Sequence, residues 1–186
     1  MPAEQKYARI EWERRFLLDR FPRAALVTRV RRISDRYIEG TTLRLRQQSD
    51  SDGRTVFKLT QKLADQANGA RQGLITSMYL TSVEFIMLAK LPAKELTKTR
   101  LSVPPFGIDV FDGVLSGLIL AEAEFNSDAE AAALALPSFI GHEVSNDSRF
   151  TGGHLVSVSR QELENWLDEH GIKLDSSRGE EHFRSG

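Results

Sequence analysis

The chain has 186 residues, of which 40% are hydrophobic and 27% are charged, and its formal net charge is −1. This length suits one domain with its own core, and the small net charge excludes a bulk field that would attract nucleic acid or an anionic membrane. The absence of cysteine excludes disulfides and thiolate metal sites, and no apolar run reaches the roughly 20 residues of a membrane-spanning helix. We therefore expect a cytoplasmic protein with one domain over residues 1–174 and a disordered polar tail over residues 175–186.

The N-terminal part of the chain alternates between apolar and charged residues with the period of two that is typical of a β-strand. In the segment 9–16, Glu11, Glu13 and Arg15 share one face of the expected strand, while the other face is mainly apolar. Two carboxylates at this spacing can approach one hard cation together, because such cations prefer oxygen ligands.

Two further segments, 42–46 and 57–62, repeat this design with basic side chains on the polar face. Asp52-Gly53 lies between them and is a hairpin signal, so we expect the two strands to pair. The basic residues on these faces are Arg44, Arg46, Lys58 and Lys62.

The rest of the chain contains further strands and a few helices. Shorter strands are expected over 74–80, 98–103 and 107–111. The strand expected over 118–125 carries Glu122 and Glu124 on one face. Helices are expected after the capping-box patterns at 81–84 and 159–162, and over the Ala-rich segment 128–136.

The charged faces of these strands are, taken singly, also typical of the solvated side of an antiparallel sheet. The sign of the charge is uniform within most segments, however, so that Arg44 repels Arg46 and Glu122 repels Glu124. Such repulsion is tolerable where the faces converge on a ligand that supplies the opposite charges, as in the lumen of a closed β-barrel. A metal-chelated triphosphate has this character. The pattern therefore predicts an antiparallel β-barrel whose charged interior binds a triphosphate.

These residues resemble those of the CYTH family, also called the triphosphate tunnel metalloenzymes, over residues 6–158. The family signature is a Glu-x-Glu-x-Lys strand, to which the segment 11–18 is similar. The other matching segments are, in chain order, 43–46, 59–62, 98–100, 109–111, 121–125 and 143–144, with Asp147 and Arg149. Each motif is short, and it is their order and spacing together that make the resemblance specific.

The resemblance implies an α+β fold, in which an eight-stranded antiparallel β-barrel forms a tunnel with helices packed outside and Mg²⁺ or Mn²⁺ inside. It implies that the metal is held by Glu11, Glu13, Glu122 and Glu124, which with Arg15 form the catalytic set. It implies that the triphosphate is held by Arg44, Arg46, Lys58, Lys62, Lys98, Arg100 and Arg149.

Three features depart from the family pattern. Arg15 stands where the signature has lysine, which exchanges a compact ammonium for a planar guanidinium. Gly73 and Ile75 lie on a strand where family members often place carboxylates. The segment 150–153 has no lysine, although one is expected at the plug of the tunnel.

We therefore expect metal-dependent hydrolysis of a triphosphate, with inorganic tripolyphosphate as the substrate because no residue cluster suggests a pocket for a base or a thiazole. Attack of a metal-activated water on a terminal phosphorus would need no protein nucleophile. One alternative is an adenylate cyclase that makes cyclic AMP from ATP, and another is a non-catalytic module that binds polyphosphate or nucleotide. We expect neither a nucleic-acid nor a membrane partner, and a homodimer stays open.

Overall fold

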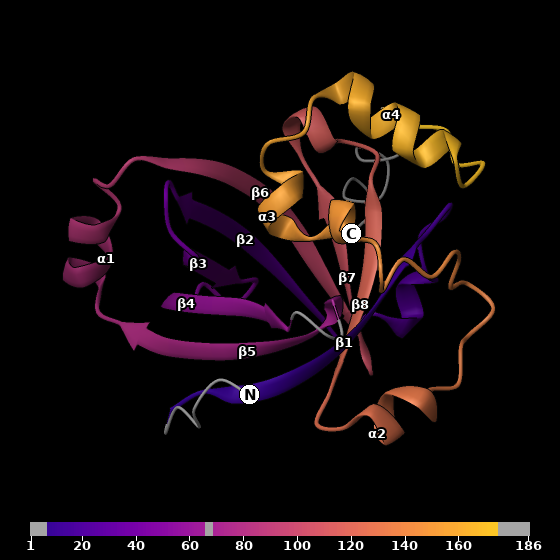
Figure 1. The fold of residues 1–186 in the computed structure, drawn as a ribbon, viewed down its shortest axis with the longest axis horizontal. Helices are drawn as coiled ribbons and strands as arrows, with labels where there is room; N and C mark the ends of the chain where they lie inside the picture. Colours follow the sequence, from indigo (N-terminus) through magenta and orange to yellow (C-terminus); the bar gives the residue numbers. More distant parts are fainter. Residues whose placement is uncertain (1–6, 66–68, 175–186) are drawn as a thin grey trace.

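The computed structural model describes residues 7–65 and 69–174, and the tail expected at 175–186 lies outside this part of the chain. Eight antiparallel strands close into a barrel in the spatial order β1-β5-β4-β3-β2-β6-β7-β8 (Figure 1). The strands are β1 (Arg9–Leu17), β2 (Arg29–Ile38), β3 (Leu43–Asp50), β4 (Thr55–Asp65), β5 (Gly69–Leu80), β6 (Ala93–Val103), β7 (Phe106–Phe111) and β8 (Ile119–Phe125). The predicted α+β class and the eight-stranded antiparallel barrel with flanking helices are confirmed.

The strand that the sequence pattern did not reveal is β2. Its charged residues stand side by side at 31–32 and 35–36, so its two faces do not alternate cleanly. In the barrel, β2 pairs along its length with β3 and β6, and this pairing satisfies its backbone hydrogen bonds. The strands expected over 74–80 and 98–103 are longer than predicted, because pairing extends them back to Gly69 and Ala93.

The turn between β3 and β4 is the hairpin that Asp52-Gly53 predicts. Gly53 has a φ of 84°, a left-handed conformation that glycine adopts without the steric cost of a side chain. The amide of Gly53 donates to the carbonyl of Asp50 at 3.0 Å. The resulting register places Arg46 opposite Lys58, so both basic side chains point to the same face.

An apolar cluster, here called the floor, closes one end of the barrel interior. Its strand residues each lie two positions from a charged residue such as Arg15 or Glu122, and therefore share a face with it. They are Leu17, Leu96, Phe111 and Leu120. They pack against Phe150 of η3 (Ser148–Phe150), Leu155 of α3 (Gly152–Leu155), and Leu163 and Leu167 of α4 (Arg160–Asp168). Figure 1 shows α3 and α4 together on one side of the barrel.

A second apolar cluster covers the outer wall formed by β1, β6, β7 and β8. Phe16 and Ile108 are fully buried there, in one cluster with Phe139 from the loop after α2. The helix α2 (Asp128–Ala132) is shorter than the Ala-rich helix that the sequence predicts. Leu134, two residues after the end of this helix, packs against the outer cluster.

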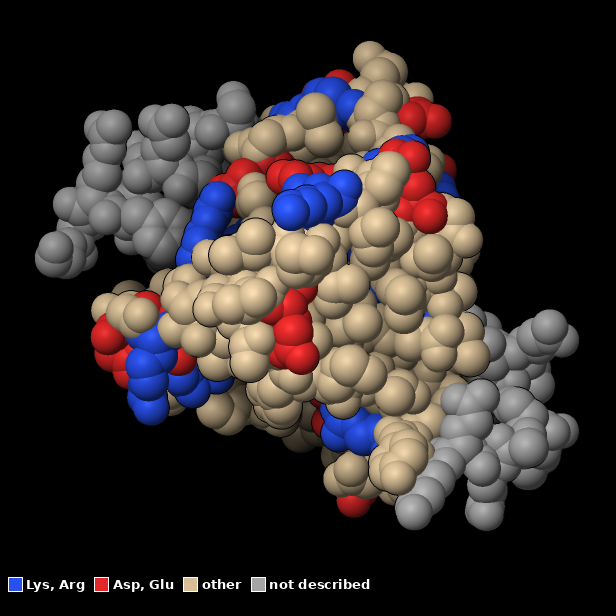
Figure 2. All heavy atoms as spheres, turned by 90° about the vertical axis from the view of Figure 1, so that its left-hand side faces the viewer, with Lys and Arg blue, Asp and Glu red and all other residues tan. Residues whose placement is uncertain are grey.

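The helix α1 (Ser82–Leu88) links β5 to β6 and lies at the left-hand end of the molecule in Figure 1. Its predicted capping box forms between Thr81 and Glu84, and the second predicted box, between Ser159 and Glu162, begins α4. Figure 2 shows that uncharged side chains occupy most of the face that bears α1. Among the described residues, no helix is both long enough and apolar enough to span a bilayer.

The contact between Gly152 at the start of α3 and Tyr37 of β2 can be tested by substitution. A Cβ added at Gly152 would lie 2.0 Å from the hydroxyl oxygen of Tyr37, whereas one added at Gly153 would meet nothing within 4 Å. We expect Gly152→Ala to lower the free energy of unfolding by about 1–3 kcal/mol, the usual cost of overpacking, and Gly153→Ala to change it by less than about 0.5 kcal/mol. Urea unfolding at pH 7 measures both changes. Tyr37→Phe serves as a second background, because it removes this hydroxyl together with its hydrogen bond to Arg44. Gly152→Ala should cost much less in that background than in the unaltered chain, and an equal cost in both would contradict the contact.

Candidate active site

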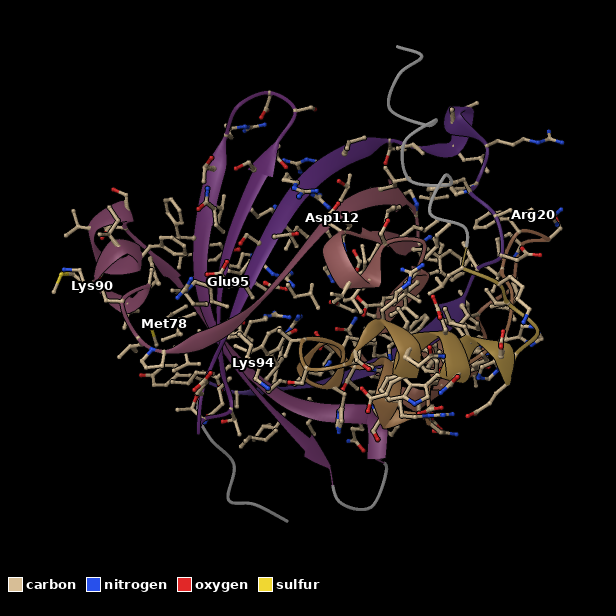
Figure 3. The ribbon with its side chains drawn as sticks, turned by 90° about the horizontal axis from the view of Figure 1, so that it is seen from above. Arg20, Met78, Lys90, Lys94, Glu95 and Asp112 are labelled. Carbon is tan, nitrogen blue, oxygen red and sulfur yellow. The ribbon has the colours of Figure 1, made fainter. Side chains whose placement is uncertain are left out.

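The strand registers turn charged side chains from most of the barrel strands toward the lumen. Residues that face each other across two strands point to the same side of the sheet, so cross-strand pairs identify the inner face. These pairs include Arg46–Lys58, Arg31–Arg100, Arg15–Glu122 and Glu13–Glu124. Along β6 the side chains alternate, since Lys94 reaches Ser157 beyond α3 while Glu95 pairs with Arg36 on the other face (Figure 3).

The inner face collects all but one of the residues that the sequence predicts for the site. By strand parity and register, they are Glu11, Glu13, Arg15, Arg44, Arg46, Lys58, Lys62, Lys98, Arg100, Glu122 and Glu124. Arg149 is the exception. The acidic members and most of the basic members lie on different walls of the lumen, whereas Arg15 lies on β1 opposite Glu122 and Lys62 reaches Glu11 and Glu13.

The basic wall is built on a buried carboxylate. Asp35 of β2 is fully buried and accepts hydrogen bonds from Nε and Nη2 of Arg46 at 2.6 and 2.7 Å, while Nε of Arg44 lies 3.8 Å away. Burial by itself would raise the pKa of Asp35, but the charges of Arg44 and Arg46 lower the pKa to about 2. The ionised carboxylate fixes the orientation of Arg46, whose cross-strand neighbour Lys58 lies with its ammonium 5.1 Å from the ring of Tyr79.

A second buried carboxylate anchors the neighbouring part of the basic wall. Asp109 of β7 is fully buried, pairs with Lys98, and accepts hydrogen bonds from Nε and Nη2 of Arg100 at 2.6 Å each. Arg100 also donates to Glu122 and so joins the basic wall to the acidic one. The Arg100 side chain lies over Gly107, where an added Cβ would be 3.2 Å from its Cδ atom. The glycine therefore provides the room in which this guanidinium lies.

The acidic wall comes from β1 and β8. Its carboxylates are Glu11, Glu13, Glu122 and Glu124, and Glu13 lies directly opposite Glu124 across the two strands. Lys62 of β4 stands between two of them, with Nζ 3.2 Å from Glu11 Oε2 and in contact with Glu13. Within residues 7–65 and 69–174, no three His, Asp or Glu side chains are already drawn together as metal ligands. The wall thus offers carboxylate oxygens that are at present neutralised by basic side chains.

The carboxylates of this wall influence one another's protonation. Burial, followed by the charges of Glu11 and Glu13, raises the pKa of Glu124 to about 6. The Glu124 side chain is 53% exposed, so solvent weakens this effect without reversing it. Burial opposes ionisation of Glu122 as well, but the cations of the basic wall outweigh it and lower its pKa. Burial also opposes the charge on Lys62, yet Glu13 and then Glu11 outweigh it and raise the pKa of this lysine.

Arg15 lies where the end of β1 meets the segment 142–145. This segment pairs with β1 through backbone hydrogen bonds and an isolated bridge. Arg15 donates through Nη2 to the carbonyl of Ser145 at 3.2 Å, and its Nε atom lies 3.9 Å from Glu13. Ser145 also accepts a hydrogen bond from the amide of Arg15 at 3.0 Å. Ser145 therefore holds this guanidinium beside the acidic wall.

Arg149 is not brought together with the other predicted phosphate ligands. Its guanidinium is held by Asp147 and by Glu169, with the shortest contact to each at 2.7 Å. It lines a cavity of about 690 Å³ that is formed by residues 143–149 and His170. These two carboxylates occupy most of the N–H donors of Arg149. Its role as a ligand of the triphosphate stays a prediction from the sequence.

Four residues of the site were given no role by reasoning from the sequence. Asp109 of β7 lies in the matching segment 109–111, and its place as a buried counter-ion was missed. Asp35 and Arg31 lie on β2, and Arg31 faces Arg100 across the strands and donates to the hydroxyl of Ser102 at 3.0 Å. Both residues share a face with Ile33 and Tyr37, and because this face mixes charged and apolar side chains it gives no periodic signal. The fourth, Ser145, lies in a loop and has no periodic signal.

Removing the charge of Asp109 should destabilise the barrel strongly. Asp109→Asn keeps the shape of the side chain but leaves Lys98 and Arg100 without their buried counter-ion, so we expect the free energy of unfolding to fall by about 3–5 kcal/mol. Asp112→Asn is the control, because Asp112 pairs with the half-exposed Arg32 and its loss should cost less than about 1 kcal/mol (Figure 3). Urea unfolding at pH 7 measures both variants. Equal losses in the two would contradict the anchoring role of Asp109.

Neutralising Glu124 should stabilise the metal-free protein in a pH-dependent way. A carboxyl whose pKa is raised in the folded state, here to about 6, costs stability once the pH exceeds its unfolded value, and this cost is complete above pH 6. Glu124→Gln removes the cost, so its melting temperature in EDTA should exceed that of the unaltered protein at pH 7.5, with a smaller difference at pH 4.5. Glu39→Gln, in the exposed turn after β2, serves as control. A gain that is the same at both pH values would argue against repulsion.

The chain is similar in sequence and in fold to proteins that are already known. The chain is 34% identical over 149 residues to a protein of Nitrosomonas europaea named inorganic triphosphatase, a match that covers 75% of this chain and 92% of that protein. Two crystal structures, described as the hypothetical protein NE1496 and the inorganic triphosphatase NE1496, match 80% of this chain and 99% and 96% of theirs, each with 26% identity and a TM-score of 0.52. No family model matches the chain. On the identity and coverage of the curated match, the chain belongs to the family of the Nitrosomonas europaea inorganic triphosphatase.

Proposed function

We propose that the barrel lumen is the active site of an inorganic triphosphatase, which hydrolyses tripolyphosphate with the help of a divalent cation. The observation that carries this proposal is the division of one lumen into a basic and an acidic wall, joined by the contact of Arg100 with Glu122. A polyanion bound together with a cation is the kind of ligand that satisfies both walls. The finer assignment to the CYTH family, or triphosphate tunnel metalloenzymes, is part of the same proposal.

The basic wall is suited to hold phosphoryl oxygens. Arg46 and Arg100 each use Nε and Nη2 to bind an aspartate, and a guanidinium has five N–H donors, so each retains donors for an anion. Asp35 and Asp109 act as positioning residues, because they fix these guanidiniums before substrate arrives. Preorganised cations of this kind stabilise the charge that spreads over the phosphoryl oxygens as a phosphoanhydride bond breaks.

The acidic wall fits a divalent cation of the hard type. Glu11, Glu13, Glu122 and Glu124 offer only carboxylate oxygens, the ligands that Mg²⁺ and Mn²⁺ accept. The pKa of Glu124 is raised partly by the charges of its acidic neighbours, and such a cluster gains from a bound cation. When bound, this cation supplies positive charge to the phosphoryl oxygens and activates the attacking water. The choice between Mg²⁺ and Mn²⁺ is left to experiment.

A turnover panel tests the proposed reaction. Tripolyphosphate, ATP and thiamine triphosphate are each incubated with Mg²⁺ and with Mn²⁺, and both phosphate release and cyclic AMP are measured. We expect metal-dependent phosphate release, fastest from tripolyphosphate, and none in EDTA. Cyclic AMP as the main product from ATP would instead indicate a cyclase, and tight binding without turnover would indicate a binding module.

Variants of the acidic wall test where the metal binds. Glu13→Gln and Glu122→Gln keep the shape of the side chain and remove one charge, so we expect turnover at limiting metal to fall by about 100-fold or more. Because the lost interaction is with the metal, higher Mg²⁺ or Mn²⁺ should partly restore the rate. The melting temperature of each variant shows that the barrel is intact. Unchanged turnover in both variants would remove these residues from the metal site.

A further inference from the structure

The ammonium of Lys62 lies at β1 although the residue belongs to β4. The strand β5 separates these two strands in the barrel. Lys62 Nζ is 3.2 Å from Glu11 Oε2 and also contacts Glu13, whose side chains are only 5% and 8% exposed. The Lys62 side chain is 40% exposed, so its ammonium contacts these carboxylates while part of the side chain stays in solvent. One lysine thus bridges two buried carboxylates.

Gly73 of β5 provides the passage for this lysine. It pairs with Glu11 of β1 on one side and with Ala64 of β4 on the other. A Cβ added at Gly73 would make tight contacts of 3.3 Å with Cε of Lys62 and with the carbonyl oxygen of Leu63, and would lie at an ordinary 3.5 Å from Cγ of Lys62. The absence of a side chain at position 73 therefore leaves room for the Lys62 stem beside β5, on the path of its ammonium to Glu11 and Glu13.

A divalent cation cannot share this position with the ammonium. The oxygens that Lys62 contacts belong to two of the four carboxylates that the acidic wall offers to a metal. A hard metal ion binds carboxylate oxygens at about 2.0–2.6 Å, so it would lie within a few ångströms of Nζ. Two cations at that separation in a partly buried site repel each other strongly. Metal binding at Glu11 and Glu13 therefore requires Lys62 to move.

A lysine displaced from Glu11 and Glu13 would be free to bind a phosphoryl oxygen of a substrate in the lumen. Its stem is flexible and unbranched, and it faces the same lumen that holds Lys58 and Arg46. We propose that Lys62 competes with the divalent cation for Glu11 and Glu13, and that metal binding releases its ammonium to a phosphoryl oxygen of the triphosphate. This inference rests on the proposed metal-dependent triphosphatase function. By reciprocity of linkage, metal and triphosphate then favour each other's binding, because each takes one partner of an existing ion pair.

The affinity of the full chain for Mn²⁺ alone, measured by calorimetry without phosphate, tests this competition. Lys62→Met keeps an unbranched stem and removes the charge, so we expect it to bind Mn²⁺ about tenfold more tightly, in line with the loss of a unit charge a few ångströms away. Lys58→Met is the matched control on the same strand. Its ammonium lies over the Tyr79 ring, and the described residues show no carboxylate contact for it, so the affinity should change by less than about twofold.

A titration of the unaltered protein tests the same idea without a substitution. Nuclear magnetic resonance of the lysine ammonium groups should show the Lys62 signal, assigned with the Lys62→Met variant, shifting as Mg²⁺ is added. Equal or weaker Mn²⁺ affinity in Lys62→Met, or a Lys62 signal that ignores Mg²⁺ while the protein binds it, would overturn the competition and leave the metal site standing. Mn²⁺ binding that Glu13→Gln does not weaken would overturn the proposed metal site itself, and this inference with it.

Discussion

The ion pairs inside the barrel are the constraint on which the rest of the structure depends. Basic side chains that point into one closed lumen repel each other, and an unpaired charge there would cost several kcal/mol. Asp35 and Asp109, both fully buried, offset this repulsion and hold Arg46 and Arg100 by two hydrogen bonds each. These ion pairs also favour the observed strand register. If a strand slipped by one residue, each of its charged side chains in the lumen would point to the outer wall and lose its partner.

Apolar packing closes one end of the barrel and covers part of its outer surface. The floor buries Leu17 and Leu120 under α3 and α4, so that the charged part of the lumen ends in a dry cluster rather than in solvent. The outer wall of β1, β6, β7 and β8 is covered by the flanking loops. The charged residues thereby lie beyond this apolar floor, and around the buried ones, such as Arg46 and Lys98, a low local dielectric strengthens the interaction with an anion.

Glycines beside long side chains recur at this site. Arg100 lies over Gly107, Lys62 crosses β5 over Gly73, and the hydroxyl of Tyr37 lies against Gly152 at the start of α3. Gly73 and Gly152 lie in two of the segments where the sequence departs from the family that it resembles. The departures are therefore linked to the packing of particular neighbours, and at Gly73 the neighbour is a cation that stands among the carboxylates.

The sequence by itself determined which residues carry charge on one face of a strand, because a period of two survives in β1, β3, β4 and β8. The hairpin at Asp52-Gly53 and both capping boxes were equally local and were predicted for that reason. Only the tertiary structure decided that β2 is a strand, since its pairing with β3 and β6 outweighs its irregular pattern. It also decided that Asp35 holds Arg46, that Lys62 reaches across β5 to Glu11, and that Arg149 lies with Asp147 and Glu169. Strand pairing brings Asp35 to Arg46 and Lys62 to Glu11, and the packing of η3 against the end of α4 brings Arg149 to Glu169; no local pattern encodes these distances.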